Sequence, residues 1–257
     1  MNNDFPKISI ITPTLNQGKF IKKTIDSVLE QGYPNYEYVV VDGGSTDGTI
    51  EILKSYGSAI KWISEKDGGQ ADAINKGIKL STGEIIGFIN SDDFYLHNVF
   101  VMVADFFKDN PDIYWYSGNY FIIDDREKEI QPLVVLYKNL FRYFSNPHTL
   151  RLTNYLIQPS TFWRRSVHTK IGLFDSTLRY AFDYDFWVRL MDNYPHQCTN
   201  TPFSAFRIHN ESKGGVEYKY QFEEENKVLQ RYRTTKFELS FHIVHNKLIT
   251  AAYNLIK

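Results

Sequence analysis

Short apolar runs alternate with segments of helical hydrophobic spacing along the first hundred residues. The β-branched run ISIITPT, at Ile8–Thr14, is closed by Pro13 and suits a strand buried on both faces, and the run YEYVVV within residues 36–49 is predicted as a second buried strand. Two further strands are predicted around Lys61–Ser64 and in EIIGFIN at residues 84–90. The pattern therefore predicts four strands in this part of the chain.

Three helices are predicted between these strands. KFIKKTIDSVLEQG, at residues 19–32, places its apolar side chains on one face, and Gly32 and Pro34 end it. TIEILKSY at residues 49–56 follows a glycine-rich turn, and the segment at residues 67–83 contains a third helix. Strands that alternate with helices through short connections indicate parallel strands with right-handed crossovers.

Polar residues follow three of the predicted strands at the point where each strand ends. Thr12 and Pro13 close the first strand, Asp42 closes the second, and Asp92 and Asp93 follow the fourth. In parallel α/β sheets the ligand crevice lies beyond the carboxyl ends of the strands. These groups are therefore expected to meet at one rim of the sheet.

The second half of the chain is less regular. VFVMVADFFKD at Val99–Asp109 is predicted as a helix, and residues 112–124 as one or two strands with antiparallel character. Residues 134–155 mix aromatic residues, basic residues and proline, so we expect an irregular or mobile surface segment there. YDFWVRLMDNY at residues 184–194 is predicted as an amphipathic helix, and two more helices are expected from residue 217 onward.

Composition limits the classes of function. The 257 residues are 42% hydrophobic and 16% aromatic, which suits one large α/β domain or two small ones. A formal net charge of −1 gives no general attraction to nucleic acid, so we expect no nucleic-acid partner. The single cysteine, Cys198, excludes an internal disulfide and is typical of a reducing compartment.

The chain shows no apolar run of the length that a signal sequence or a membrane-spanning helix needs. We therefore expect a cytoplasmic protein. The terminal segment, at residues 237–256, carries Lys236, Lys247 and Lys257 at or near it, so peripheral contact with the inner face of the cell membrane stays open. Its apolar stripe consists of Phe241, Val244, Leu248, Ala252 and Leu255. Packing of the stripe against the domain or against a second subunit, as in a homodimer, is the favoured alternative.

Asp92 and Asp93 are adjacent acids at the end of an apolar strand. Carboxylate oxygens are hard ligands that suit Mg²⁺ or Mn²⁺, and Mg²⁺ typically binds one or two carboxylates together with substrate phosphates. One interpretation is thus a divalent cation that carries a diphosphate. The alternative is a helix cap, since an Asp before FYLHNVF can cap a turn.

Asp42 precedes two glycines in the segment VVVDGGSTDGT. An acid at such a strand end commonly accepts hydrogen bonds from a ribose or a base edge, and glycine lets the backbone approach a ligand closely. The sequence lacks both the GxGxxG motif of dinucleotide folds and the GxxxxGK[ST] motif of P-loop proteins. Neither a standard NAD fold nor an NTPase is therefore favoured.

The ordered series of motifs resembles the family 2 glycosyltransferases, which have the GT-A fold. The series begins with ISIITPTLNQGKF and continues through VVVDGGSTDGT, DGGQADAINKGI and GEIIGFINSDDFY. It resumes with QPSTFWRRSV, with IGLFDSTLRYAFDYDFWVRL and with FRIHNESK. The resemblance is dense over the first hundred residues and is nearest to bacterial enzymes that build surface polysaccharides.

The resemblance implies an α/β architecture. It consists of a Rossmann-like nucleotide-binding half with a mixed central sheet, followed by C-terminal helices. In this chain, residues 1–215 would form a single GT-A domain. Residues 1–97 would be its nucleotide-binding half, and residues 98–215 its acceptor half. Residues 216–257 would add a helical extension.

The resemblance also implies a set of donor-binding residues for a nucleotide sugar. The residues on the side of the base and ribose would be Thr12, Pro13, Asp42 and Asp92. Asp67, with Gln70 and Asn75 nearby, would line the nucleotide or diphosphate side.

A metal ion, Mn²⁺ or Mg²⁺, is implied as the cofactor. Asp93 stands where the family has its metal-binding acid, and His209 in FRIHNES matches a histidine that completes the site in relatives. Asn90 stands where many relatives have a further Asp, which removes one charge from the site.

The general base is implied to be Asp183 in AFDYDFW. Phe182 replaces the Glu that usually precedes this acid, which makes Asp185 a rival. Helical spacing turns Asp185 to a different face from Asp183.

Together these residues imply an inverting, metal-dependent glycosyltransferase. It would move a hexosyl or N-acetylhexosaminyl group from a nucleotide sugar, with UDP favoured, to a hydroxyl of a saccharide or lipid-linked acceptor in polysaccharide biosynthesis. Two other functions stay open. A sugar-1-phosphate nucleotidyltransferase would need a glycine-rich basic loop that TPTLNQGKF does not supply. A non-catalytic sugar-nucleotide-binding partner is compatible with the departures at Asn90 and Phe182.

Overall fold

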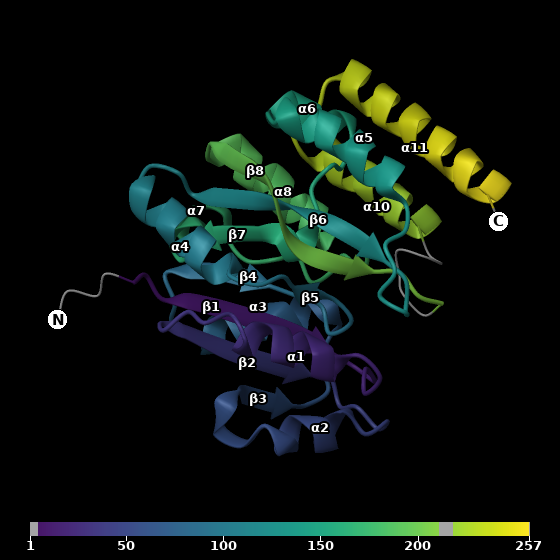
Figure 1. Cartoon of the computed structure of the whole chain (residues 1–257). Coiled ribbons are helices and arrows are strands. Elements are labelled where there is room, and N and C mark those ends of the chain that lie inside the picture. The colour runs from purple at the N-terminus through teal and green to yellow at the C-terminus, as the bar shows by residue number, and fades with distance from the viewer. Residues whose placement is uncertain (1–4, 211–217, 257) are drawn as a thin grey trace.

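Four parallel strands form one half of the central sheet, in the order β3-β2-β1-β4 (Figure 1). The computed structural model describes residues 5–210 and 218–256. The strands are β1 Ile8–Thr14, β2 Tyr36–Asp42, β3 Lys61–Ser64 and β4 Ile85–Phe88. All four strands that the apolar runs predict are confirmed.

Helices connect these strands, as the spacing of apolar residues predicts. They are α1 Ile21–Leu29, α2 Thr49–Ser55 and α3 Gln70–Leu80, with a short 3₁₀ helix at Gly57–Ala59. The α3 helix packs closely on β1 at Gly77, where an added Cβ would clash with the side chain of Ile11. A larger residue at position 77 would therefore push α3 off the sheet.

The other half of the sheet has a mixed strand arrangement. It continues from β4 in the order β7-β6-β8-β5. Strand β7 runs antiparallel to both β4 and β6, β8 runs parallel to β6, and β5 runs antiparallel to β8. These strands are β5 Phe94–Tyr95, β6 Trp115–Ile123, β7 Thr161–Arg164 and β8 His196–Arg207. The expected α/β class with a mixed sheet is confirmed.

The segment expected to be irregular or mobile is helical instead. It contains α5, Pro132–Tyr143, and α6, Pro147–Leu152. Each helix has a proline at its start, where the missing N–H group has no helical partner to lose, so proline begins these helices and does not break them. The Asn146 side chain also caps α6 by accepting hydrogen bonds from two backbone N–H groups. The expectation for residues 134–155 is therefore wrong.

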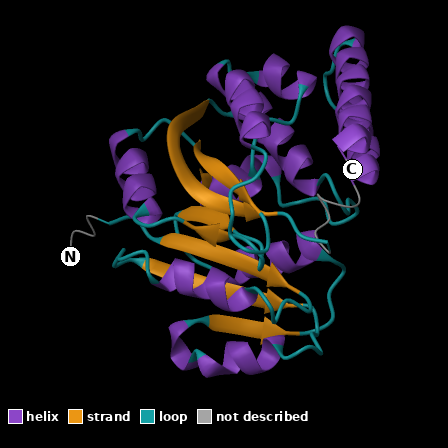
Figure 2. Ribbon diagram, turned by 45° about the vertical axis from the view of Figure 1, so that its right-hand side comes forward, coloured by secondary structure: helices purple, strands orange, loops and turns teal. Residues whose placement is uncertain are grey.

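The remaining helices cover the second half of the sheet, and α5, α6, α10 and α11 gather at one end of the molecule (Figure 2). Helix α11 packs against α10 and α6, and α10 also contacts α8. The two helices expected from residue 217 onward are confirmed. The elements are α4 Val99–Asp109, α7 His168–Ile171, α8 Phe182–Asn193, α10 Tyr218–Arg231 and α11 Lys236–Ile256, with 3₁₀ helices at Gln158–Ser160 and Arg165–Val167.

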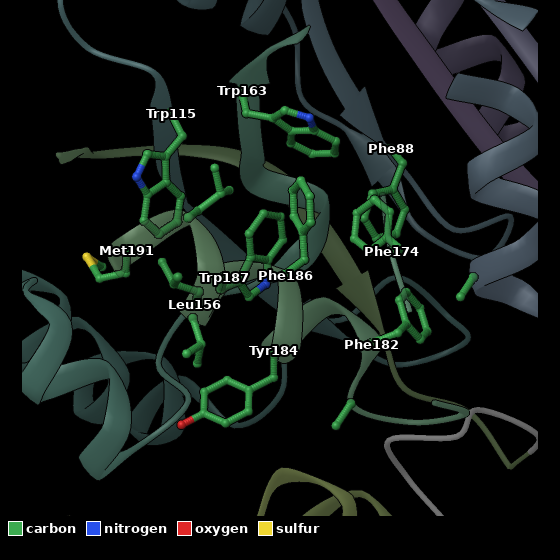
Figure 3. Close-up of a cluster of buried hydrophobic side chains, with 14 of the residues drawn as sticks. Phe88, Trp115, Leu156, Trp163, Phe174, Phe182, Tyr184, Phe186, Trp187 and Met191 are labelled. Carbon is green, nitrogen blue, oxygen red and sulfur yellow. The ribbon is translucent and has the colours of Figure 1, made fainter. Parts of the chain in front are cut away.

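An aromatic core joins α8 to the sheet (Figure 3). Trp163 of β7 and Trp187 of α8 are fully buried, with ring centroids 5.8 Å apart. Phe182, at the start of α8, packs against Phe174 and Phe88. This packing fixes the first turn of α8 relative to the end of β4. Within the described part of the chain, no helix combines the length and the apolar character needed to cross a bilayer.

Candidate active site

A cavity of about 750 Å³ opens at the carboxyl ends of β1 and β4. In the sheet, β2 lies on one side of β1 and β4 lies on the other side. The chain connections on the two sides of β1 therefore diverge at this point. Such a switch point leaves a crevice in open α/β sheets. The cavity extends from this crevice to α5, α8, α10 and α11, and its lining includes Pro13, Asp67, Gln70, Asp92 and Asp183.

Asp92 lines the cavity and contacts His209, which is not itself a lining residue. Asp92 Oδ2 lies 3.0 Å from His209 Nε2, and the two side chains are 19% and 5% exposed. Asp92 follows β4 and His209 follows β8, and the short strand β5 joins the two segments by pairing with β8. A carboxylate oxygen and an imidazole nitrogen that converge in this way can hold one divalent cation from two sides.

Asp93 is buried and lies outside the cavity lining. It is 1% exposed, and its carboxylate accepts hydrogen bonds from the Arg207 N–H group at 2.8 Å and from Asn90 Nδ2 at 3.2 Å. Burial, together with the negative charge of Asp92, raises the pKa of Asp93 well above its usual value. The expected roles, with Asp93 on the metal and Asp92 nearer the ribose, do not fit this geometry, because Asp92 is the acid beside His209.

Two residues at the start of α3 face the cavity, as the resemblance implies. Asp67 accepts a hydrogen bond from the Gly69 N–H group at 2.8 Å, and Gln70 Nε2 donates to Asn90 Oδ1 at 2.6 Å. Pro13, at the end of β1, also belongs to the lining. These residues stand together on the side of the cavity formed by the parallel strands.

Thr12 and Asp42 lie outside the cavity lining and are fully buried. The Thr12 hydroxyl is 2.9 Å from the hydroxyl of Tyr38. The Asp42 carboxylate accepts hydrogen bonds from the N–H group and hydroxyl of Ser45 and from the Ser64 hydroxyl at 2.7 Å. Asp42 thus holds the glycine-rich turn after β2 in place.

Asn75 is also outside the lining and serves packing. Its amide accepts from the Phe174 N–H group at 3.0 Å and donates to the Phe174 carbonyl at 2.9 Å. This reciprocal pair ties α3 to the loop before α8. The structure therefore does not bring Asn75 to the site.

Asp183 reaches the cavity from the first turn of α8. Burial raises its pKa to about 6, and the charge of Glu225 adds to the rise, whereas the Tyr184 N–H group and the charge of Lys138 oppose it. Asp183 is therefore ionised at neutral pH but titrates well above an ordinary aspartate. This position and this pKa suit a general base.

The rival acid, Asp185, is unavailable for that role. It is 1% exposed and accepts hydrogen bonds from Arg189 Nε at 2.9 Å and from the Tyr232 hydroxyl at 2.6 Å. The helix turns it into the packing between α8 and the end of α10, as the helical spacing predicts. Asp183 is thus the acid of this pair that faces the cavity.

Sequence reasoning missed the residues that α5, α10 and α11 bring to the cavity. They include Lys138 of α5, Glu225 of α10 and Asn246 of α11. Lys138 fell in the segment taken as irregular, and Glu225 stands in a run of three glutamates that resembles a solvated helix face. Only the packing of these helices distinguishes the buried Glu225 from the exposed Glu223 and the partly buried Glu224.

Residues 9–172 match the family model described as glycosyl transferase family 2. An uncharacterized glycosyltransferase of Rickettsia typhi is 34% identical over 202 residues, which cover 74% of this chain and 60% of the relative. A PGL/p-HBAD biosynthesis glycosyltransferase of Mycobacterium bovis is 30% identical over 196 residues, covering 73% of this chain and 71% of the relative. The chain thus spans only 60% of the length of the Rickettsia relative.

Solved structures share the fold. The complex of S. aureus TarS 1-349 with UDP-GlcNAc has a TM-score of 0.66 and 18% identity, covering 93% of this chain and 71% of that protein. The mannosyltransferase PcManGT from Pyrobaculum calidifontis, in complex with GDP-Man and Mn²⁺, has a TM-score of 0.68 and 19% identity, covering 95% of this chain and 69% of that protein. The expected GT-A fold is confirmed.

Proposed function

The chain belongs to glycosyl transferase family 2, and from this premise we propose that it is an inverting, metal-dependent glycosyltransferase. One observation carries the proposal. Asp183, with its raised pKa, lines the same cavity as Asp92, which is paired with His209, although the three residues come from distant segments. A base and a cation-binding pair in one cavity are what direct transfer of a sugar from a diphosphate to a hydroxyl needs.

The donor is proposed to be a nucleotide sugar, with UDP favoured, that delivers a hexosyl or N-acetylhexosaminyl group. The nucleotide would lie along Pro13, Asp67 and Gln70, at the edge of the parallel strands. The UDP-GlcNAc complex of TarS, which shares the fold, supports this choice. The acceptor would be a hydroxyl of a saccharide or lipid-linked molecule in polysaccharide biosynthesis.

Asp92 and His209 are proposed to hold the metal ion, Mn²⁺ or Mg²⁺. They fit such an ion because their oxygen and nitrogen atoms converge 3.0 Å apart and Asp92 lines the cavity. In the described part of the chain, no three His, Cys, Asp or Glu residues cluster as a metal site, so diphosphate oxygens and water would supply the other ligands. When bound, the ion would offset the negative charge that develops on the departing diphosphate.

Asp183 is proposed to accept the proton of the acceptor hydroxyl. As the hydroxyl oxygen attacks the anomeric carbon, the bond from that carbon to the diphosphate oxygen breaks, and its electron pair leaves with the diphosphate. Attack from the side opposite the leaving group inverts the anomeric configuration. A pKa of about 6 keeps Asp183 ionised at neutral pH and still basic enough to take the proton.

The substitution Asp183→Asn tests this function directly. Transfer should fall about 100-fold to 10,000-fold, because general-base catalysis contributes that much, while UDP with Mn²⁺ should still raise the melting temperature. Asp105→Asn, on the exposed face of α4, is the matched control and should keep full transfer. A wild-type protein that binds UDP without turnover would point to a binding partner, and release of pyrophosphate from a nucleoside triphosphate would point to a nucleotidyltransferase.

A cytoplasmic location, with peripheral membrane contact or a homodimer, belongs to the same proposal. The stripe predicted on the terminal helix is exposed at Phe241, Val244 and Leu248 of α11, which are 39%, 56% and 66% accessible, so the domain leaves much of their surface uncovered. The side chains of Ala252 and Leu255 lie outside the described residues. An exposed apolar stripe suits an interfacial helix or a second copy. Flotation with anionic vesicles and the mass in solution would separate these two.

A further inference from the structure

A lysine faces the part of the cavity next to Asp183 and has no partner there. Lys138, from α5, is half-buried and belongs to the cavity lining. Among residues 5–210 and 218–256, its ammonium group makes neither a hydrogen bond nor an ion pair. A half-buried cation has lost part of its hydration, so such a group normally has an anion beside it.

The nearby carboxylates have other partners. Glu225 accepts hydrogen bonds from Asn154 and Gln221 at 3.1 Å and from His242 and Asn246 at 3.2 Å. Burial alone would raise the pKa of Glu225, but the hydrogen bond and charge of His242, with the hydrogen bonds from Asn154 and Gln221, lower it. These four hydrogen bonds compensate the buried charge of Glu225. The charge of Lys138 is therefore left without a hydrogen-bonded partner.

Asp183 also has a local partner in the Tyr184 N–H group, at 2.7 Å. Lys138 acts on it only through space, and no ion pair joins the two. Burial lowers the pKa of Lys138, and the charges of Glu225 and Asp183 oppose this shift. An anion bound at Lys138 would compensate the hydration that its ammonium group has lost.

The other cations in the described lining are placed differently. Arg207 donates to the backbone carbonyl of Asp92 at 2.9 Å and to that of Asp124 at 3.1 Å, and it pairs with Glu127. Arg179 is exposed and lies over the ring of Tyr180. Lys138 is therefore the lining cation on the α5 side of Asp183, where an acceptor would approach.

We propose that the part of the cavity between α5, α8 and α11 is an acceptor subsite for a saccharide that carries a negatively charged group, and that Lys138 pairs with this group. The group is a carboxylate or a phosphate. The inference rests on the proposed function, because Asp183 marks the position of the attacked hydroxyl. The charged group would lie close to that hydroxyl, on the same or an adjoining sugar.

Binding of matched sugar probes tests the proposal. The probes are methyl β-glucoside, its 6-phosphate and methyl β-glucuronide, titrated into the full chain with UDP and Mg²⁺ present and followed by ligand-observed NMR. At least one charged probe should bind about tenfold more tightly than the neutral one, because a charge-assisted hydrogen bond contributes about that much. The charged probe that binds more tightly indicates whether the charged group of the acceptor is a phosphate or a carboxylate.

Three variants assign the preference to the lysine. Lys138→Met should abolish it and Lys138→Arg should keep it, while Lys247→Met, an exposed lysine of α11 outside the lining, should leave it unchanged. Melting temperatures confirm that each variant is folded. Equal binding of charged and neutral probes to the wild type, or a preference that survives in Lys138→Met, would overturn the proposal.

Nucleotide binding separates this inference from the proposed function. If UDP with Mg²⁺ stabilises the wild type but no charge preference appears, the acceptor proposal alone fails. If no nucleoside diphosphate binds, the function itself fails. If Lys138→Met loses UDP binding, the lysine serves the donor diphosphate, which also overturns the acceptor subsite.

Discussion

The two halves of the sheet differ in how they hold the site. In the half made of β1 to β4, the strands are parallel and helices connect them, so polar residues collect at one edge by topology alone. In the half made of β5 to β8, pairing is mixed, and distant helices supply Lys138, Asp183 and Glu225. The first half positions residues by a repeated pattern, and the second by individual long-range contacts.

The cavity lies where the two halves meet. Asp92 follows β4 of the parallel half. It contacts His209, which follows β8 of the mixed half. Asp183 comes from α8, which the aromatic core fixes to β4 and β7. Neither half carries the proposed chemistry alone, so variants on each side of this junction should have different and separable effects.

The largest effect on the metal dependence is expected from the two adjacent acids after β4. Asp92→Asn should remove the Mn²⁺-dependent part of UDP stabilisation and reduce transfer by about 100-fold or more, because it removes a proposed metal ligand. Asp93→Asn should keep the metal dependence, because Asp93 is buried and bonded to Arg207. Thermal shifts with and without Mn²⁺ measure both. The reverse result would restore Asp93 as the ligand.

A tenfold effect per pH unit is expected from Asp183. Its ionised form accepts the proton, so kcat/KM should be constant above pH 7 and fall tenfold per unit below about pH 6. Lys138→Met should move this acid limb to higher pH, since the lysine charge lowers the pKa of Asp183. The pH profiles of the two proteins, measured at fixed Mn²⁺, check the sign. A shift to lower pH would contradict the electrostatic account.

The smallest effect on activity is expected at Asn75. Asn75→Ala should lower the free energy of unfolding by about 1–3 kcal/mol, because two hydrogen bonds to Phe174 are lost in a buried place. The affinity for UDP should change less than about twofold. Asn193→Ala, exposed at the end of α8, is the control and should stay within about 0.5 kcal/mol of the wild type. A large loss of UDP affinity in Asn75→Ala would return this residue to the donor site.

Much of the first half could be predicted because its signals are local. An apolar run of four to seven residues and a helix with one apolar face are both read within a short window, and the connections between them set the parallel topology. This local pattern predicts Pro13 at the strand end that borders the cavity, whereas the expectation for Asp67 and Gln70 comes from the family resemblance. Asp42 was placed at the right strand end, but its carboxylate bonds to its own turn.

The second half was harder for physical reasons. Strand β7 has four residues and β8 begins with polar ones, so neither shows an apolar pattern of its own. Each of α5 and α6 has a proline as its first residue. In the sequence such a proline is typical of a helix end, unless its position in the first turn of a helix is known. Which of Asp92 and Asp93 faces the cavity depends on the Arg207 backbone, 114 residues further along the chain, and no local pattern encodes that contact.

A crystal structure of the protein with UDP and Mn²⁺, with the ion located by its anomalous scattering, tests the central claim most directly. The account predicts Mn²⁺ bound by Asp92, His209 and the diphosphate, with the carboxylate of Asp183 in the same cavity and facing the side from which an acceptor enters. Mn²⁺ held by Asp93, or a nucleotide in a cavity that Asp183 does not line, would contradict it.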